Sequence, residues 1–399
     1  MGDSRTASDD LEVRADAARA DPHPFPVVAI MLRGLPCGTN VALFRFMAWP
    51  SSGTHAHSHG RGEAGTSGLF RHVAVCIDGS SLAEWTVPHA VAMARAFDAE
   101  LSVLHVLETR HNGDAALPDP LDWQLARFQA ADYLHGVVAR TRAGSTVDRN
   151  EEVQSELLEG APPLQIRRWI EDHGVDLAVI CTHGTKGPTE WPLASTARKL
   201  LDELRCSMLV VPAAAVEEGI AAPRYARVLI PLDGSLWSES ALPFAVRLAE
   251  VHDATLILAH AVPCPDLTRA GAIPPTSEDL ELERRLITRN ERVGREYLDH
   301  LRARLSATGL NVSTVVESEG TVSSELKHAI ARAEPDLIVL PACGASGPGA
   351  ESYGAVALYL LTQASKPVLL LRPPPGTVGV QPWSGPRGTA ARPPSQASS

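Results

Sequence analysis

Short apolar runs alternate with amphipathic stretches along most of the chain, and the whole alternation occurs twice. Each round begins with an apolar run, "HVAVCI" or "RVLIPL", that is followed by Asp-Gly-Ser and then by apolar positions at helical spacing over 82–97 or 237–251. An apolar run that leads into Asp-Gly-Ser is typical of a strand followed by a turn and a helix N-cap. We therefore expect each round to open with a strand, a turn and a helix.

The remainder of each round repeats this order. A second apolar run ("LSVLHVL" or "TLILAHAV") precedes a loop and a second helix, and in the first round that helix carries an apolar series at helical spacing: Leu121, Leu125, Phe128, Leu134 and Val138. Further strands, with helices between them, are expected at 153–158, 177–182 and "SMLVVP", and again at 312–316, 337–342 and "PVLLLRP". The strands are continuously apolar, which predicts an α/β fold with a parallel sheet covered by helices on both faces.

The two rounds are related in sequence as well as in pattern. The thirty residues from Asp78 to Leu107 match those from Asp233 to Val262 at twelve identical positions without a gap, and "DLAVICTHGTKG" matches "DLIVLPACGASG" later in each round. The chain is therefore predicted to be a tandem duplication, with domains at 69–213 and 225–374 and a linker at 214–224. The Gly-, Pro- and Ser-rich flanks, 1–68 and 375–399, are predicted to be disordered.

Composition narrows the classes of protein that this chain can be. Its 399 residues are 44% hydrophobic, which is enough for two cores. The net charge of -11, without any run of Lys and Arg, argues against a nucleic-acid or anionic-membrane partner. No apolar stretch approaches the roughly 18 residues that a spanning helix needs. The six scattered cysteines form no CxxC pair, so a reduced, cytoplasmic setting is expected.

The common catalytic motifs are missing from the sequence. It contains no GxxxxGK[ST] loop, no GxSxG elbow and no HExxH pair, and "STARK" places Arg198 where an SxxK nucleophile motif needs lysine. No general base stands out beyond the aspartates of the Asp-Gly-Ser turns. We therefore expect a binding protein rather than an enzyme.

Three short motifs carry a resemblance to a known family. The "DGS" turn, the "LHV" of the second strand and the "THG" turn after the fourth strand resemble a universal stress protein domain, and the whole chain resembles a tandem member of that family. The resemblance implies two five-stranded parallel sheets of flavodoxin-like or Rossmann-like, adenine nucleotide alpha hydrolase-like type, paired through their last strands. It also implies ATP at the carboxyl ends of the first and fourth strands, where open α/β sheets bind ligands.

The nucleotide signature of that family is Gly, two residues, Gly, nine residues, Gly, and then Ser or Thr. Such a turn brings backbone N–H groups close to phosphates and leads into a helix N-terminus that favours anions. In the first repeat the signature falls on Cys181, Gly184, Ala194 and Ser195, so two of its glycines are replaced. In the second repeat it falls on Pro341, Gly344, Gly354 and Ala355, so the first glycine and the hydroxyl are replaced. The site is therefore degenerate, and it is better preserved in the first repeat.

Other positions enter the predicted site through the same resemblance. Asp78 and Asp233 match an aspartate near the ribose and base, although each could instead close an Asx-turn or cap the next helix. Val106 and Ala261 match the point where the second strand meets the adenine. The predicted cofactor-binding residues, for ATP with Mg²⁺, are Ile77, Asp78, Val106, Cys181, Gly184, Ala194, Ser195, Thr196, Asp233, Ala261, Gly344 and Gly354.

Histidines offer further candidates, each with a plainer alternative. His105 and His260 recur in the two repeats, but a lone histidine in an apolar strand is usually a hydrogen-bonded structural residue. His183 lies in the turn and could touch phosphate. The alternating histidines of "THAHSHG" could bind a divalent metal, yet no other ligand lies nearby in sequence, so no metal site is predicted.

Two functions remain in competition. The first is a regulatory ATP-binding module of the stress response, with at most weak ATP hydrolysis. Its nucleotide changes its association with unidentified protein partners. The alternative is a ligand-free tandem scaffold that acts through protein contacts. Gly184 and Ser195 favour the first function, while Cys181 and Pro341 favour the second. The two domains are expected to form an intramolecular pseudo-dimer, and a further homodimer stays open.

Overall fold

The computed structural model describes the two repeats and little beyond them. The described residues are 69–108, 119–144, 153–184, 193–213, 223–262, 276–318, 320–343, 353–363 and 365–372. They all belong to one compact unit, Glu63–Ser399. The two flanks predicted to be disordered, most of the predicted linker and the histidines of "THAHSHG" lie outside the described residues.

Each repeat contains five strands and five helices among its described residues. The first repeat consists of β1 (His72–Ile77), α1 (Ser81–Glu84), α2 (Thr86–Phe97), β2 (Glu100–Leu107), α3 (Pro120–Gly144), β3 (Val153–Glu159), α4 (Pro162–Asp172), β4 (Leu177–Cys181), α5 (Ser195–Glu203) and β5 (Ser207–Val211). The second consists of β6 (Arg227–Pro231), α6 (Leu236–Glu239), α7 (Leu242–His252), β7 (Thr255–Ala261), α8 (Ser277–Ser306), β8 (Asn311–Glu317), α9 (Val322–Ala333), β9 (Leu337–Pro341), α10 (Ala355–Gln363) and β10 (Val368–Leu371).

The strands form one ten-stranded sheet with the order β3-β2-β1-β4-β5-β10-β9-β6-β7-β8. Neighbouring strands are parallel within each repeat, and the repeats join through an antiparallel pair in which Leu369 of β10 lies opposite Leu209 of β5. The order within a repeat, 3-2-1-4-5, is the Rossmann order 3-2-1-4-5-6 without its last strand, rather than the 2-1-3-4-5 of flavodoxin. Pairing through the last strands agrees with the family resemblance.

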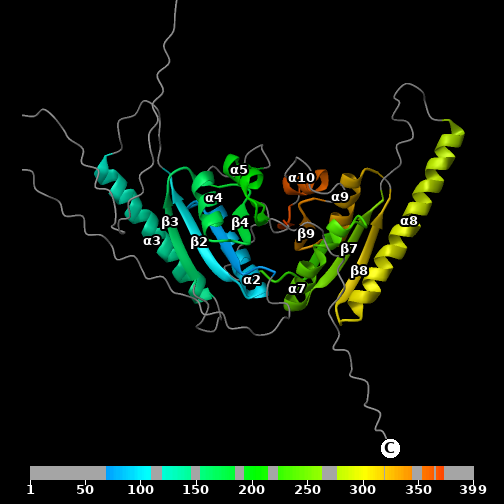
Figure 1. The fold of residues 1–399 in the computed structure, drawn as a ribbon, viewed down its shortest axis with the longest axis horizontal. Coiled ribbons are helices and arrows are strands. Elements are labelled where there is room, and N and C mark those ends of the chain that lie inside the picture. The colour runs from blue at the N-terminus through cyan, green and yellow to red at the C-terminus, as the bar shows by residue number, and fades with distance from the viewer. Residues whose placement is uncertain are drawn as a thin grey trace, which may run out of the picture. The chain divides into compact units, whose positions relative to one another are not determined.

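Helices cover both faces of this sheet (Figure 1). On one face, buried side chains of α2, α3, α7 and α8 pack against strand residues such as Val73 and Leu256. On the other face, α4, α5, α9 and α10 pack against alternate strand residues such as Ala74 and Ile257. Each of these two cores runs through both repeats, so the duplication forms a single folded body. None of the described helices is long and apolar enough to cross a membrane.

The first helix expected in each repeat is in fact two helices. The helices expected at 82–97 and 237–251 are each interrupted, giving α1 with α2 and α6 with α7. Pro88 and Pro243 lie near the start of α2 and α7, and a proline has no N–H to donate to the carbonyl four residues earlier.

The apolar series of the second helix does not lie on one face. At 100° per residue, the six-residue step from Phe128 to Leu134 places the two side chains about 120° apart around the helix axis. Leu134 and Val138 are buried, whereas Leu121, Leu125 and Phe128 are 75%, 56% and 70% exposed.

Aromatic and polar side chains hold the two repeats together beneath the β5–β10 pair. The Phe70 ring lies 4.8 Å from that of Phe97 and 4.9 Å from that of Phe244 in the second repeat. Arg247 Nε of α7 donates to the Ala96 carbonyl of α2 at 2.7 Å. Tyr225, which is only 1% exposed, places its hydroxyl 2.7 Å from Nδ1 of His89 on α2. The junction thus depends on a buried tyrosine and a histidine that stays neutral.

The stability of this junction should depend on pH. Burial lowers the pKa of His89 to about 4, from 6.5 in an unfolded chain, and it lowers the pKa of His252 in the same direction. Between pH 6.5 and 4 the unfolded chain therefore binds a proton at His89 that the folded chain does not, so stability falls as the pH falls. The loss is at most about 3 kcal/mol for His89. Denaturant unfolding at pH 7 and pH 5 measures it.

A matched pair of variants isolates His89. His89→Gln should make the unfolding free energy less dependent on pH across this interval, whereas the same change at the exposed His135 should leave the dependence as it is. An unchanged pH dependence in His89→Gln would contradict the assignment.

One buried carboxylate lies in the second repeat without a partner. Glu325 of α9 is 1% exposed, and neither carboxylate oxygen has a hydrogen-bond partner in the described part of the chain. Its counterpart at the same repeat offset is Gln165, and both side chains lie against the glycine before their helix. A Cβ on Gly160 would be 2.8 Å from Gln165 Nε2, and one on Gly320 would be 2.8 Å from Glu325 Oε1. The first repeat thus carries a neutral amide at the equivalent position, where it is partly buried.

Glu325→Gln should therefore stabilise the protein. Removing a buried carboxyl oxygen that has no hydrogen-bond partner is expected to raise the unfolding free energy by about 1 kcal/mol or more, which corresponds to roughly 2 °C or more in Tm. Thermal unfolding followed by circular dichroism measures the change, with Glu250→Gln on the exposed side of α7 as the control. A fall in Tm would show that the carboxylate itself supports α9.

Candidate functional site

The turns that follow β1 and β6 have the same geometry. Asp78 Oδ1 accepts hydrogen bonds from the Ser80 amide at 3.0 Å and the Ser80 hydroxyl at 2.6 Å, and Asp233 Oδ1 accepts from Ser235 at 2.9 and 2.6 Å. The serine oxygen then accepts from an amide in the first turn of α1 or α6, at 3.1 Å in both repeats. Each aspartate therefore closes an Asx-turn, and the serine, rather than the aspartate, caps the helix.

In the first repeat the turn after β4 packs against the turn after β1. A Cβ added to Gly184 would lie 1.9 Å from Asp78 Oδ2 and 3.0 Å from its Cγ. The backbone φ of Gly184 does not lie in the left-handed region, so lack of space alone requires glycine here. Because β1 and β4 are adjacent and parallel, with Val75 opposite Val179, their carboxyl ends bring these two turns together.

Residues that begin α5 complete this edge of the sheet. Ala194 is the N-cap, with φ -63° and ψ 155°, an extended conformation that any residue can adopt. The methyl that replaces the expected glycine therefore causes no backbone strain. The first intrahelical bond runs from Arg198 N to Ala194 O at 3.0 Å, so the amides of Ser195 and Thr196 have no acceptor within the helix.

Thr182, which the sequence analysis did not select, fixes this loop. Its carbonyl accepts from the Ala194 amide at 2.8 Å, and its hydroxyl accepts from the Ala213 amide at 3.0 Å. In the second repeat the Gly354 amide donates to the Ala342 carbonyl at 2.8 Å, so the same closure forms without the hydroxyl. The available signal was the "THG" motif itself, in which the threonine recurs as alanine in the second repeat.

The second repeat differs most where its central strands end. Pro231 and Pro341 occupy the carboxyl ends of β6 and β9, and neither has an N–H to donate. Gly344, the counterpart of Gly184, lies outside the described residues. Gly354 precedes α10, and Ala355 begins it without the hydroxyl that Ser195 has. The second repeat thus presents fewer donors at this edge.

The remaining predicted site residues lie in or beside the strands. Ile77 and Val106 are buried at the ends of β1 and β2, and Ala261 ends β7 with partial exposure. Cys181 ends β4, where burial raises the pKa of its thiol, so it is a neutral group. All four residues are uncharged, and they lie at or next to the carboxyl ends of their strands.

Histidines at the strand ends form hydrogen bonds within the chain. His105 Nδ1 lies 2.9 Å from the Ile77 carbonyl, and His260 Nδ1 lies 2.7 Å from the Leu232 carbonyl. His183 is buried, with Nδ1 3.0 Å from the Thr182 hydroxyl. Among the described residues no group of three or more His, Cys, Asp and Glu side chains could hold a metal ion.

Comparison with known proteins gives a consistent picture. The model of the Universal stress protein family matches residues 69–212 and 224–372. The universal stress protein MJ0531 of Methanocaldococcus jannaschii is 26% identical over 144 residues, which cover 36% of this chain and 82% of that relative.

Solved structures extend the similarity to both repeats at once. A universal stress protein from Archaeoglobus fulgidus is 15% identical, with a TM-score of 0.53, over 76% of this chain and 98% of that one. The protein PA1789 from Pseudomonas aeruginosa is 16% identical, with a TM-score of 0.50, over 76% and 93%. At this level of identity the similarity concerns the fold alone.

Proposed function

The chain belongs to the universal stress protein family, and we propose that its first repeat binds ATP with Mg²⁺ as a regulatory ligand. The observation that carries this proposal is the contact between Gly184 and Asp78, which brings the turns after β1 and β4 together beside the start of α5. This is the place where open α/β sheets bind ligands, at the carboxyl ends of their strands.

The groups present at this edge fit a nucleotide phosphate. Because Gly184 has no side chain, the turn after β4 can approach Asp78, so that the two turns meet beside the start of α5. The amides of Ser195 and Thr196, at the N-terminus of α5, are donors aimed outside their helix, and the helix dipole there favours negative charge. The side-chain hydroxyl of Ser195 adds a further donor. The extended backbone of Ala194 makes the loss of the signature glycine tolerable, so the replacement does not argue against binding.

Asp78 has a narrower role in this proposal. Its Oδ1 is engaged in the Asx-turn, so the aspartate holds the turn in shape while Ile77 and Val106 border the base. Magnesium would arrive with the triphosphate and neutralise part of its charge. Binding, rather than hydrolysis, is the proposed activity, and the second repeat, with prolines at the ends of β6 and β9, contributes a weaker site. The setting that we propose is the cytoplasm, in the response to stress.

Calorimetric titration of the full chain with ATP, with and without magnesium, tests this function. We expect one site with a dissociation constant in the micromolar range, roughly -7 to -8 kcal/mol. Gly184→Glu should abolish it, because the added side chain would overlap Asp78 Oδ2 and force the turn after β4 away from the start of α5. The matched change Gly344→Glu in the second repeat should leave it intact.

Two outcomes would contradict the proposal. An absence of heat and of any thermal shift at millimolar ATP would leave the turn as a scaffold and redirect the search to protein partners. Loss of binding in Gly344→Glu alone would move the site to the second repeat.

A further inference from the structure

The helix α3 exposes an apolar row on the side that faces away from the sheet. Leu121, Leu125 and Phe128, called the α3 stripe below, are separated by four and then three residues, so they lie on one side of the helix. Ala130, nine residues after Leu121, is buried, and nine steps of 100° place it diametrically opposite. The stripe is therefore no part of the core.

The helix is well formed at the stripe. The Leu121 amide donates to Asp119 Oδ1 at 2.8 Å, and the Trp123 amide donates to the Asp119 carbonyl at 3.0 Å. Asp119 therefore acts as an N-cap, and the three apolar side chains are presented by a regular helix.

The second repeat shows what the same face looks like when it meets water. Tyr133 of α3 and Tyr297 of α8 pack edge-to-face on His105 and His260, so the two helices align with a constant offset of 164 residues. With this offset the α3 stripe corresponds to three arginines: Arg285, Arg289 and Arg292.

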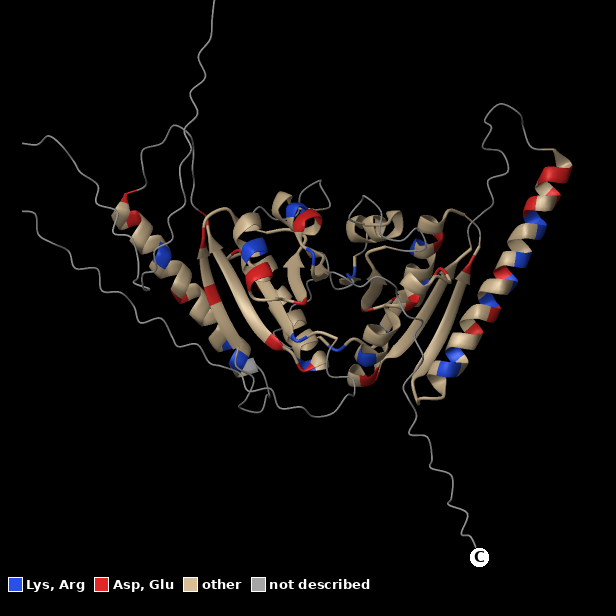
Figure 2. Cartoon of the chain, viewed as in Figure 1, with Lys and Arg blue, Asp and Glu red and all other residues tan. Residues whose placement is uncertain are grey.

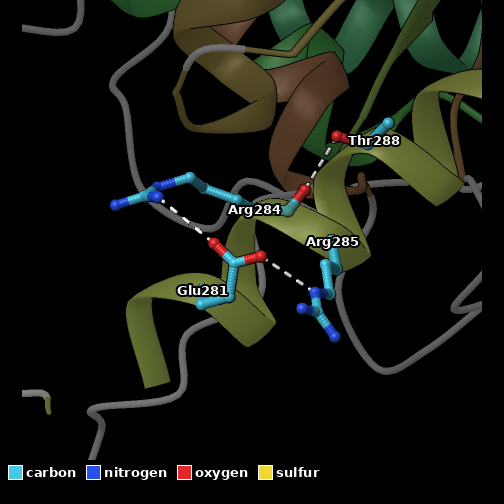
Figure 3. Close-up of polar contacts among 4 residues, drawn as sticks. All are labelled: Glu281, Arg284, Arg285 and Thr288. Carbon is cyan, nitrogen blue, oxygen red and sulfur yellow. Dashed lines mark hydrogen bonds and ion pairs between the residues drawn. The ribbon is translucent and has the colours of Figure 1, made fainter. Parts of the chain in front are cut away.

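Those arginines are exposed, and two of them form ion pairs along their own helix. Arg285 Nε lies 2.9 Å from Glu281 Oε1, as Figure 3 shows, and Arg292 pairs with Glu296. Figure 2 shows the contrast directly, because charged residues recur along the whole length of α8 while α3 is mostly uncharged. Equivalent exposed positions of the two repeats thus carry apolar side chains on α3 and arginines on α8. Exposure to solvent alone does not explain the apolar side chains of α3.

A second copy of this chain fits the stripe. Spacing of four and three is that of the a and d positions of paired helices. In an antiparallel pair about a two-fold axis, Leu121 meets the partner's Phe128, and Leu125 lies near the partner's Leu125. The flanking Asp122 then lies beside the partner's Gln129, so no like charges meet although the chain has a net charge of -11. A two-fold interface of this kind is self-complementary, as in most homodimers.

We propose that the chain forms a homodimer in solution through the stripe of Leu121, Leu125 and Phe128 on α3. The contact is small, which places it among transient interfaces with dissociation constants of roughly 1 to 100 µM. It leaves the β5–β10 pair within each chain as it is. It is also independent of nucleotide binding.

Sedimentation velocity of the full chain over a range of concentrations tests this proposal. The variant Leu121→Arg, Leu125→Arg, Phe128→Arg copies α8 and should raise the dimer dissociation constant at least about 100-fold. Because α8 tolerates arginine at these positions, the variant should keep the circular dichroism spectrum and Tm of the wild type. The control Leu282→Arg changes an exposed leucine of α8 and should not affect association.

Two further variants test the proposal by creating a second stripe on α8 and by cross-linking the proposed interface. Arg285→Leu, Arg289→Leu, Arg292→Phe should create a second stripe and shift the chain to assemblies larger than a dimer. Leu125→Cys should form an intermolecular disulfide under mild oxidation that neither the wild type nor Leu282→Cys forms. A wild-type chain that stays monomeric up to about 1 mM, or a dimer that the α3 arginines do not weaken, would overturn the proposal. In the first case the stripe would belong to a different protein partner.

Discussion

Gly184→Ala should lower the unfolding free energy by about 1 to 3 kcal/mol and weaken ATP binding at least about 10-fold. The added Cβ would overlap Asp78 Oδ2, at 1.9 Å, so one of the two turns has to move. Movement of the β4 turn carries the loop away from the N-terminus of α5, where the phosphate donors lie. Chemical unfolding and calorimetric titration of the same variant measure the two effects.

A double-mutant cycle identifies Asp78 as the cause. Glycine at 184 is required by space and not by a left-handed backbone, so the cost of alanine should vanish when the carboxylate is removed. In an Asp78→Ala background, Gly184→Ala should cost no more than about 0.5 kcal/mol. Gly174→Ala provides the contrast, because Gly174 has φ 60° and a Cβ added there would meet no atom within 4 Å, so its cost should not depend on Asp78. If Gly184→Ala lowered the unfolding free energy equally in the wild-type and Asp78→Ala backgrounds, Asp78 would not be the group that excludes a side chain at position 184.

The duplicated α/β architecture could be predicted from sequence because it depends on repeated, strongly periodic patterns. Continuous apolar strands, separated by helices and repeated at a near-constant offset, leave few other arrangements. Pairing of the repeats through β5 and β10 followed from the family resemblance, not from the strands themselves. What failed was the finer assignment of faces. Leu121 and Leu134 are both leucines in the apolar series of α3. Only their angular positions around the helix axis decide that Leu121 is exposed and Leu134 is buried.

For the candidate site, the sequence predicts which residues follow the strands but not their backbone conformation or their contacts. The sequence places Gly184, Ala194 and Ser195 after β4, but it cannot give the φ of Ala194, on which the meaning of the lost glycine depends. Nor can it show that Asp78 approaches Gly184, since these residues are far apart in the chain and meet only through the parallel pairing of β1 with β4. The roles of Ile77, Val106 and Thr196 stay predictions.

Tyr225→Ala should be among the most destabilising single changes in the chain, with a loss of about 3 to 5 kcal/mol. Tyr225 is 1% exposed, its ring packs edge-to-face on His252 at 5.0 Å, and its hydroxyl lies 2.7 Å from His89 of the first repeat. Truncation leaves a cavity between the repeats and a buried imidazole without its partner. Equilibrium unfolding in urea measures the loss.

Tyr225→Phe separates the two contributions, because it keeps the ring and removes only the hydroxyl. We expect it to cost about 1 to 2 kcal/mol, the range for a buried hydrogen bond whose partner stays behind. His89→Gln combined with Tyr225→Phe should then cost less than the sum of the two single changes, since the two residues share one hydrogen bond. If Tyr225→Ala and Tyr225→Phe were equally destabilising, the ring would contribute little, and the two repeats would be held together by the β5–β10 pair and the phenylalanine cluster alone.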